Sequence, residues 1–279
     1  MLGPDMLGLG DKVALVWGGG FGMGEATSRR LAQTGARVAV IDIVGERAEA
    51  VAGDIVAGGG DAVALSADVT SEASVEAALA SAERSLGPVD VMATVIGIGV
   101  WGQLVDFTLE QWEEAHRLNL TSFFLPARAV ARSLIANRKP GAIACVSSVS
   151  GLTSAPNHGG YGAAKAGMIN LVRTMAAEWG PLGIRVNAVM PGSCATPRLV
   201  GNEAAVDAMN AAMKDKIPLG RAATPDEIAK ALVFLLSDLA SYVTGHNLCV
   251  DGGWTSTFLM QGGTGSMSNA AAGSALPPT

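Results

Sequence analysis

The sequence predicts a single α/β domain, residues 1–279, built on a doubly wound parallel sheet of about seven strands with helices on both faces. Short runs of almost continuous apolar residues alternate along the chain with segments of helical periodicity. Such strands are typical of a parallel sheet that helices cover on both sides, because neither strand face meets water. Hydrophobic residues make up 49% and charged residues 16% of the chain, which suffices for a large core.

The first half of the chain alternates strands and helices in a regular order after a short extension of about ten residues. "KVALVW" and "ARVAVIDI" are runs of apolar, β-branched-rich sequence that indicate buried strands. We expect strands at 12–17, 36–43, 62–69 and 89–96, with helices that start at Glu25 and span 45–57 and 71–87.

Two capping boxes mark helix starts in the second half. Thr108 precedes Gln111 by three residues, and Thr224 precedes Glu227 in the same way, so each pair satisfies the first N–H groups of a helix. We expect strands at 141–148, 184–190 and 246–253, and helices at 108–137, 158–179 and, more weakly, 202–215. The Gly-, Ala- and Ser-rich tail 262–279 is flexible by composition, so the core spans about 10–255.

Charge and cysteine content exclude several classes of function. The net charge of −6 argues against nucleic acid or an anionic membrane as a partner, since both need a basic surface. Three scattered cysteines without a CxxC pair fit a reducing cytosol, and no signal peptide or membrane-spanning run is recognisable, so we expect a cytoplasmic protein. The three histidines lack ligand spacing, and we expect no catalytic metal.

A glycine-rich turn follows the first predicted strand. Gly18, Gly22 and Gly24 have the spacing GxxxGxG, between a strand and a helix. Backbone N–H groups and a helix N-terminus can approach a phosphate closely there, because no side chain blocks the way. Taken alone, the spacing fits a plain tight turn equally well.

An acidic residue ends the second predicted strand, eighteen residues after the last glycine of this turn. A carboxylate at Asp42 can accept hydrogen bonds from the 2′-OH of an adenosine ribose and repels a 2′-phosphate. The alternative is a solvated turn residue. The glycine turn holds no Lys or Arg and Ile43 follows Asp42, so we expect nothing nearby to compensate a 2′-phosphate. The pattern favours NAD over NADP as the cofactor.

A tyrosine and a lysine share one face of the helix at 158–179. Tyr161 and Lys165 lie four residues apart in "YGAAK", and Ser148 precedes the tyrosine by thirteen residues. An isolated tyrosine and lysine at this spacing more often form a solvated helix face.

Together these motifs resemble the short-chain dehydrogenase/reductase family over roughly residues 10–255. The matching segments, in order, are the glycine turn, "DV" at Asp68–Val69, Asn119 in "LNLTS", Ser148 in "SSVSG", the YGAAK pair, Pro191, Gly192 and Thr196 in "PGSCAT", and "VDGGW" near the end. The resemblance implies a Rossmann-type fold and a nicotinamide dinucleotide cofactor. It also implies a homotetramer, which pairs the helices at 108–137 and 158–179 across a two-fold axis.

The resemblance implies a role for each site residue. Tyr161 exchanges a proton with the substrate oxygen, Lys165 lowers the pKa of Tyr161 and holds the nicotinamide ribose, and Ser148 hydrogen-bonds the substrate oxygen. Asn119 holds a water that relays protons to Lys165. The implied cofactor-binding residues are Gly18, Phe21, Gly22, Met23, Gly24, Asp42, Ile43, Asp68, Val69, Ile96, Gly97, Tyr161, Lys165, Pro191, Gly192 and Thr196.

Two segments depart from the family pattern. Trp17 replaces the usual threonine before the first glycine, and "TVIG" at 94–97 replaces the usual Asn-Asn-Ala-Gly. We expect Trp17 and Val95 to replace a polar tie between two strand ends with an apolar contact, which leaves no single buried polar group unpaired.

The loops after the fourth, fifth and sixth predicted strands are expected to surround the substrate. Their side chains are mostly apolar, with Arg198 as the exception, so we expect a neutral, largely apolar secondary alcohol or its ketone. The candidate substrate residues are Ser148, Tyr161, Trp101, Leu152, His158 and Leu199. We also expect a lid at 193–219. The alternative role of the apolar side chains is only to close this lid, and the alternative for His158 is that it faces solvent.

Three functions remain at this point. The leading hypothesis is an NAD-dependent alcohol dehydrogenase. A 3-oxoacyl-thioester reductase fits the same pattern, although that role usually uses NADP and Asp42 argues against it. A non-catalytic dinucleotide-sensing protein has no need of the Ser148, Tyr161, Lys165 and Asn119 set.

Overall fold

A computed structural model describes residues 6–197 and 202–256 of the chain, and the statements below concern those residues. Seven strands form one parallel sheet, as the sequence predicts. Their order is β3-β2-β1-β4-β5-β6-β7. The strands are β1 (Val13–Trp17), β2 (Arg37–Asp42), β3 (Ala62–Ser66), β4 (Val91–Thr94), β5 (Gly141–Val146), β6 (Ile184–Pro191) and β7 (Asn247–Val250). The helices are α1 (Gly22–Gln33), α2 (Gly45–Ala57), α3 (Glu72–Leu86), α4 (Leu109–His116), α5 (Ser122–Ala136), α6 (Gly159–Trp179), α7 (Glu203–Met213) and α8 (Pro225–Leu236).

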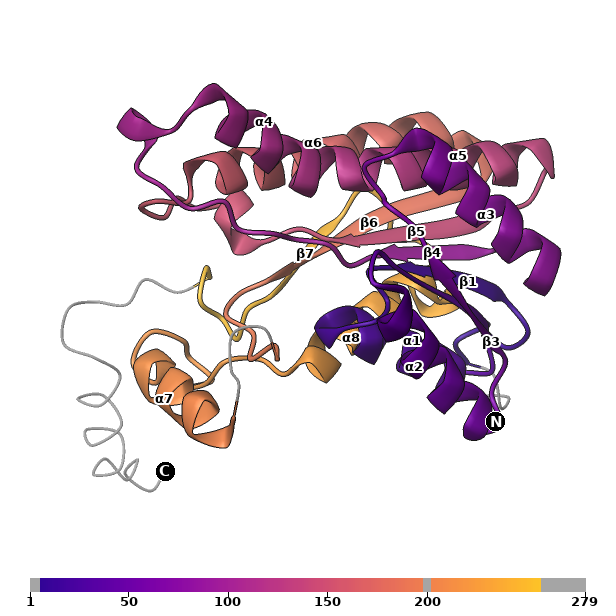
Figure 1. Cartoon of the computed structure of the whole chain (residues 1–279), viewed down its shortest axis with the longest axis horizontal. Helices are drawn as coiled ribbons and strands as arrows, with labels where there is room; N and C mark the ends of the chain where they lie inside the picture. Colours follow the sequence, from indigo (N-terminus) through magenta and orange to yellow (C-terminus); the bar gives the residue numbers. More distant parts are fainter. Residues whose placement is uncertain (1–5, 198–201, 257–279) are drawn as a thin grey trace, which may run out of the picture.

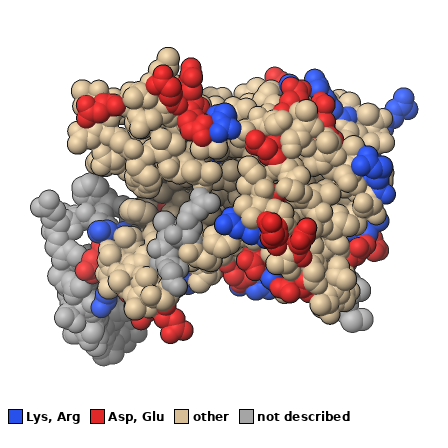
Figure 2. All heavy atoms as spheres, viewed as in Figure 1, with Lys and Arg blue, Asp and Glu red and all other residues tan. Residues whose placement is uncertain are grey.

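Helices cover both faces of the sheet (Figure 1). Helices α3, α4, α5 and α6 lie above it in this view, and α1, α2 and α8 lie below it. Each face has its own apolar cluster: Trp17 and Phe123 belong to the upper one, Leu31 and Leu232 to the lower one. Helix α7 stands apart from both layers and buries none of its residues. On the face shown in Figure 2, acidic and basic side chains are interspersed over an otherwise uncharged surface.

Both capping boxes are confirmed. Thr108 accepts from the backbone N–H of Gln111, and the Gln111 side chain accepts from the N–H of Thr108. Thr224 and Glu227 do the same at the start of α8. By contrast, α1 begins at Gly22 and not at Glu25, because its first turn contains glycines, whose poor helix propensity hides the start.

The helix expected over 108–137 is interrupted. A π-helical turn, Arg117–Thr121, separates α4 from α5. The turn contains Asn119, which is fully buried. Such turns insert one extra residue into a helix and occur frequently at functional sites. Here the turn directs Asn119 toward the loop that follows β4.

The expected apolar contact between the side chains of Trp17 and Val95 is wrong, although the backbone N–H of Val95 donates to the carbonyl of Trp17 at 2.8 Å. Trp17 packs in the upper cluster, whereas Val95 packs against the lower one, because neighbouring strand residues point to opposite faces. Trp17 instead pairs with Thr94 across the strands. The indole N–H of Trp17 and the hydroxyl of Thr94 are buried without a hydrogen-bond partner among the described residues, so this departure does leave polar groups unpaired.

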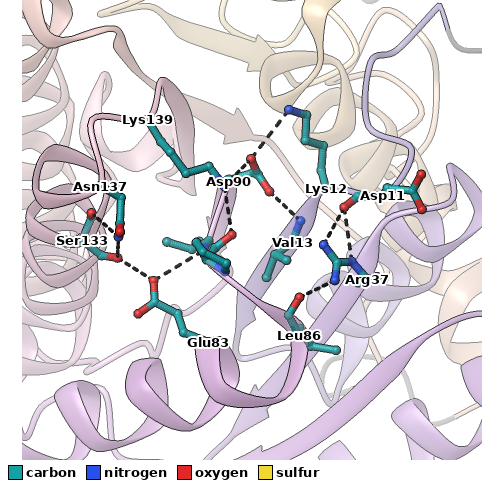
Figure 3. A network of polar contacts seen from close by, with 12 residues as sticks. Asp11, Lys12, Val13, Arg37, Glu83, Leu86, Asp90, Ser133, Asn137 and Lys139 are labelled. Carbon is teal, nitrogen blue, oxygen red and sulfur yellow. Dashed lines mark hydrogen bonds and ion pairs between the residues drawn. The ribbon is translucent and has the colours of Figure 1, made fainter.

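A polar network connects several elements at the N-terminal ends of the strands (Figure 3). The buried carboxylate of Asp90 accepts from the backbone N–H of Val13 at 2.9 Å. Its other oxygen pairs with Lys139 at 2.9 Å and Lys12 at 3.6 Å. Asp90 therefore links β1, β4 and the segment before β5 far from the carboxyl ends of the strands.

We expect Asp90→Ala to lower the free energy of unfolding by about 1–3 kcal/mol, because the buried N–H of Val13 loses its acceptor. Asp90→Asn is the matched control. It keeps an acceptor and removes only ion pairs with half-exposed lysines, which are worth about 0–1 kcal/mol. Chemical denaturation measures both variants, and equal losses would contradict the role given to this hydrogen bond.

Candidate active site

A cavity of about 550 Å³ opens at the carboxyl ends of the strands. The strand order reverses direction between β1 and β4, and open α/β sheets bind ligands at such a point. The structure brings all of the sequence-predicted cofactor residues into the lining of this one cavity: Gly18, Phe21, Gly22, Met23, Gly24, Asp42, Ile43, Asp68, Val69, Ile96, Gly97, Tyr161, Lys165, Pro191, Gly192 and Thr196.

The glycine turn fits the phosphates of a dinucleotide. Gly18 and Gly22 have positive φ angles of 75° and 58°, which side chains rarely adopt. A Cβ at Gly24 would overlap the carbonyl oxygen of Gly18, so this close crossing of turn and helix admits only glycine. Phe21, the residue before α1, provides no side-chain acceptor to the first N–H groups of the helix. These donors and the helix dipole therefore favour an anion.

Asp42 binds the glycine turn from the end of β2. One carboxylate oxygen accepts from the N–H of Gly20 at 3.1 Å, and the other accepts from the N–H of Val44 at 3.0 Å. The side chain is buried and lines the cavity. Each oxygen keeps a second lone pair. Its expected bond to a ribose hydroxyl stays a prediction.

A cation also lines this end of the cavity. Arg47, in the first turn of α2, places its guanidinium carbon 4.8 Å from the centre of the Phe21 ring. The expectation that nothing near Asp42 can compensate a 2′-phosphate is therefore wrong. The glycine turn and Ile43 carry no positive charge, but the start of α2 returns to the same place and brings Arg47 with it.

Lys165 lies at the other end of the cavity, where α6 crosses the ends of β4 and β5. Its side chain is fully buried, and its ammonium donates to the carbonyl oxygens of Ile96 at 3.0 Å and Val146 at 2.9 Å. Burial disfavours the charged form and lowers the pKa of Lys165 to about 8. The nearby thiol of Cys145 opposes this shift.

Tyr161 lies beside this ammonium, on the same face of α6. A Cβ at Gly97 would lie 3.5 Å from the Lys165 nitrogen and 3.7 Å from the Tyr161 hydroxyl, so both groups face one loop. Burial raises the pKa of Tyr161, and a hydrogen bond with Ser148 opposes the rise. The expected lowering of this pKa by Lys165 is not found, because the ammonium is directed at backbone carbonyls.

Asn119 acts behind the cavity and not in its lining. Its amide donates to the carbonyls of Ile98 and Ala115 at 2.8 and 2.9 Å, and its oxygen accepts from the N–H of Ile98 at 2.9 Å. One amide hydrogen and the oxygen thus fasten the loop after β4 to the π-helical turn, and the other hydrogen is donated back to α4. The expected water relay stays a prediction, and only acceptor lone pairs of this side chain are left for it.

The predicted substrate residues divide into separate groups. Trp101 lines the cavity and packs against His158 with ring centres 3.8 Å apart. The His158 ring lies 5.2 Å from the Tyr161 ring but is not part of the cavity lining. Burial lowers the pKa of His158, which favours the neutral imidazole. Leu152 does not line this cavity: it follows the turn after β5, is 58% exposed and borders a second hollow. Leu199 lies outside the described residues.

Comparisons with known proteins identify the family. A model described as Enoyl-(Acyl carrier protein) reductase matches residues 19–255. The chain is also similar to the crystal structure of a short-chain type dehydrogenase/reductase from Mycobacterium marinum, with a TM-score of 0.84 and 32% identity over 91% of this chain and 99% of that one. The chain belongs to the short-chain dehydrogenase/reductase family.

Two curated members of the short-chain dehydrogenase/reductase family are dehydrogenases of hydroxyl compounds. One is 2-(S)-hydroxypropyl-CoM dehydrogenase 3 of Xanthobacter autotrophicus, 37% identical over 88% of this chain and 98% of the relative. The other is cis-4-hydroxycyclohexanecarboxylate dehydrogenase of Sinomonas cyclohexanicum, 40% identical over 88% of this chain and 97% of the relative. The protein is thus an oxidoreductase of a family that uses NAD or NADP.

Several residues of the cavity lining are not predicted by the sequence, among them Arg47 and Ser147. Arg47 lies two residues after Gly45, at a predicted helix start, and this position is a usable signal. Ser147 also lines the cavity and donates to the backbone carbonyl of Lys165 at 3.2 Å, a contact that no motif predicts. In the described part of the chain, no helix meets the length and apolarity that a membrane span requires, and no cluster of three or more His, Cys, Asp or Glu could hold a metal ion.

We expect Gly24→Ala to weaken the binding of nicotinamide dinucleotides at least tenfold and to lower the melting temperature, because its methyl group displaces the Gly18 carbonyl. Gly53→Ala is the matched control: the same change in mid-α2 meets no atom within 4 Å and is expected to raise stability by up to ~1 kcal/mol. Calorimetric titration and thermal unfolding measure these effects. Unchanged nucleotide affinity in Gly24→Ala would contradict the role of the close crossing.

Proposed function

We propose that the protein is an NAD-dependent dehydrogenase that interconverts a neutral, largely apolar secondary alcohol and its ketone. One observation supports this most strongly. A tyrosine hydroxyl, a serine hydroxyl and a buried ammonium meet in the same cavity as a glycine turn at a helix N-terminus. An acid–base group within reach of a dinucleotide pocket is what oxidation of an alcohol requires.

In the proposed reaction, the hydroxyl of Ser148 and the phenol of Tyr161 hold the substrate oxygen. During oxidation the phenolate of Tyr161 accepts the hydroxyl proton of the alcohol as the carbinol carbon loses hydride and becomes a carbonyl. During reduction the phenol returns this proton to the carbonyl oxygen. When bound, the nicotinamide supplies the hydride acceptor or donor. Ser148 stabilises the charge that develops on the substrate oxygen.

Lys165 is proposed to hold the nicotinamide ribose, because its buried ammonium lines the cavity and lies 5.7 Å from the centre of the Tyr161 ring. Asn119 is proposed to fix the loop at Gly97 and Ile98, which lies beside Lys165 and next to the proposed substrate position.

The NAD preference is proposed from Asp42. Its carboxylate lines the cavity beside the glycine turn, where it would accept a hydrogen bond from the 2′-OH of a bound adenosine ribose and repel a 2′-phosphate. The neutral substrate is proposed from Trp101, an uncharged side chain of the cavity lining that packs against His158, whose pKa is lowered by burial. Arg198, the exception in the sequence, lies outside the described residues.

A thioester reductase is the second candidate. The description of the matching family model names an acyl-carrier-protein reductase, and Arg47 would suit the NADP that such enzymes usually use. Turnover of 3-oxoacyl thioesters faster than of simple ketones would favour it. The sensing role would be favoured by tight cofactor binding without turnover of any alcohol or ketone.

A cytoplasmic homotetramer stays a prediction. Leu109, Trp112 and Phe124 on α4 and α5 are exposed in the single chain and would be available to pair with a second copy. Closure of 193–219 over the cavity also stays a prediction. It fits the lack of buried residues in α7.

We expect Tyr161→Phe to lower kcat by about 10²–10⁴-fold, since the proton acceptor is lost. Binding of NAD should change little, because the ring and the i+4 lysine remain. Turnover of an alcohol panel by absorbance of reduced nicotinamide, with calorimetric titration of NAD, tests this. Retention of more than a few per cent of kcat would refute the assignment of Tyr161.

We expect Ser148→Ala to move the pH profile of alcohol oxidation toward higher pH. The hydrogen bond from Ser148 lowers the pKa of Tyr161, so its loss raises that pKa, and the phenolate forms only at higher pH. Ser154→Ala, an exposed serine on the same loop, is the matched control and should leave the profile unchanged. A profile of Ser148→Ala that coincides with the parent would show that this bond does not tune Tyr161.

A further inference from the structure

The carboxylate of Asp68 is fixed at the cavity by the residue two positions after it. Asp68 follows β3, and one of its oxygens, Oδ1, accepts from the backbone N–H of Thr70 at 2.8 Å and from the Thr70 hydroxyl at 2.7 Å. Both residues line the cavity. Among residues 6–197 and 202–256, no hydrogen bond to the other oxygen, Oδ2, is found. Oδ2 is therefore the oxygen that is left for a ligand.

Arg117 reaches this pair from the π-helical turn between α4 and α5. Its Nη1 donates to the hydroxyl oxygen of Thr70 at 2.6 Å. Its Nε and Nη2 donate to the two carboxylate oxygens of Glu114 at 2.7 and 2.8 Å. Two parallel bonds to one carboxylate fix the plane of a guanidinium, so the pair with Glu114 sets the direction in which Nη1 donates.

Arg117 determines which way the Thr70 hydroxyl points. A hydroxyl has one hydrogen to donate, whereas a guanidinium can only donate. Because Arg117 donates to the oxygen of Thr70, the hydroxyl hydrogen is left for the Asp68 carboxylate. The hydrogen bonds from Thr70, and to a smaller extent the charge of Arg117, hold the pKa of Asp68 below its ordinary value. An ionised carboxylate only accepts, so Oδ2 selects a ligand group that donates.

The sheet order places Asp68 at the nucleoside end of the site. The glycine turn after β1 fits the phosphates, and Lys165 lies on one side of it, at the ends of β4 and β5. Asp42 and Asp68 follow β2 and β3, on the other side. A dinucleotide with its pyrophosphate at the glycine turn and its nicotinamide near Tyr161 would extend its purine base toward Asp68.

We propose that Arg117 is a positioning residue for the base of the cofactor. Through Thr70 it orients Asp68, so that Oδ2 accepts a hydrogen bond from the exocyclic amino group of adenine. This inference rests on the cofactor assigned in the proposed function. The motifs that resemble the family include Asp68, but they include neither Thr70 nor Arg117. The π-helical turn thereby holds two loops of the cavity, one after β3 through Arg117 and one after β4 through Asn119.

Calorimetric titration of the full chain with NAD and with nicotinamide hypoxanthine dinucleotide tests the proposal without any turnover. The second compound carries a carbonyl oxygen where adenine carries its amino group. We expect the parent to prefer NAD by about tenfold, since a carbonyl and a carboxylate cannot hydrogen-bond each other. Arg117→Met should remove most of this preference by weakening NAD. Its melting temperature should change little, because the lost ion pair with Glu114 is half-exposed.

Three further variants separate orientation from packing. Thr70→Val keeps the shape of the side chain but removes the hydroxyl, and it should lose the preference as Arg117→Met does. Thr70→Ser keeps the hydroxyl and should retain the preference of the parent. Arg132→Met removes an exposed arginine of α5 outside the cavity lining, so it is the matched control for net charge and should change neither affinity.

Asp68→Asn tests the orientation of the side chain itself. The two donors of Thr70 would hold the amide oxygen, which leaves the amide NH₂ for the ligand. We therefore expect this variant to prefer the hypoxanthine dinucleotide, whose carbonyl accepts from that NH₂. Adding Arg117→Met should reduce the reversed preference, because the Thr70 hydroxyl then no longer holds the amide in one orientation. A reversal of the same size in both backgrounds would count against the role of Arg117.

The outcomes separate this inference from the proposed function. Equal weakening of both dinucleotides by Arg117→Met would overturn the inference and leave Arg117 a purely structural residue. An unchanged preference in Arg117→Met, or equal binding of both dinucleotides by the parent, would also overturn it. If the parent shows the preference and its loss in Arg117→Met but oxidises no alcohol, the proposed function fails while the role of Arg117 stands. If the parent binds neither dinucleotide, both fail.

Discussion

The buried ammonium of Lys165 is the constraint on which the site depends. Its only hydrogen bonds among the described residues go to the carbonyls of Ile96 and Val146, at the ends of β4 and β5, so a single charge fastens α6 to two neighbouring strands. Burial of such a charge costs on the order of several kcal/mol unless its hydrogen bonds are good. Tyr161, one turn earlier, takes its position from the same attachment, and Asn119 holds the loop that carries Ile96 onward to Ile98. The geometry of the candidate site thus follows from the position in which one lysine can donate to two carbonyl oxygens.

Stabilising contacts and candidate site residues lie at opposite ends of the strands. At the edge where the strands begin, Asp90, Lys12 and Lys139 satisfy one another and a backbone N–H. At the carboxyl ends of the strands, Lys165 has a lowered pKa, and Gly18 and Gly22 adopt positive φ. Nearby, Trp17 and Thr94 have buried polar atoms without a hydrogen-bond partner among the described residues. Conformations and groups that cost stability concentrate where ligands bind, which is common in enzymes.

The sequence predicts the sheet and most of the cavity lining, because apolar runs, capping boxes and the glycine turn are local signals. It fails where the answer depends on which elements meet in space. Trp17 and Val95 occupy positions that contact each other in the family pattern, but their side chains lie on opposite faces of this sheet. Arg47 lies on α2 yet joins the glycine turn, and Leu152 turns away from the cavity with the backbone after β5. The π-helical turn at Asn119 has no sequence signal in propensity or periodicity, because one extra residue shifts the helix without altering its composition.

Transfer of label from a deuterated alcohol tests the central claim most directly. The protein would be incubated with NAD and a panel of neutral secondary alcohols deuterated at the carbinol carbon, and the reduced cofactor would be analysed by mass spectrometry and NMR. The account predicts that deuterium appears on one face of the nicotinamide ring, together with the matching ketone, and that a primary isotope effect slows the reaction. Tight binding of NAD with no label in the ring from any alcohol would contradict it.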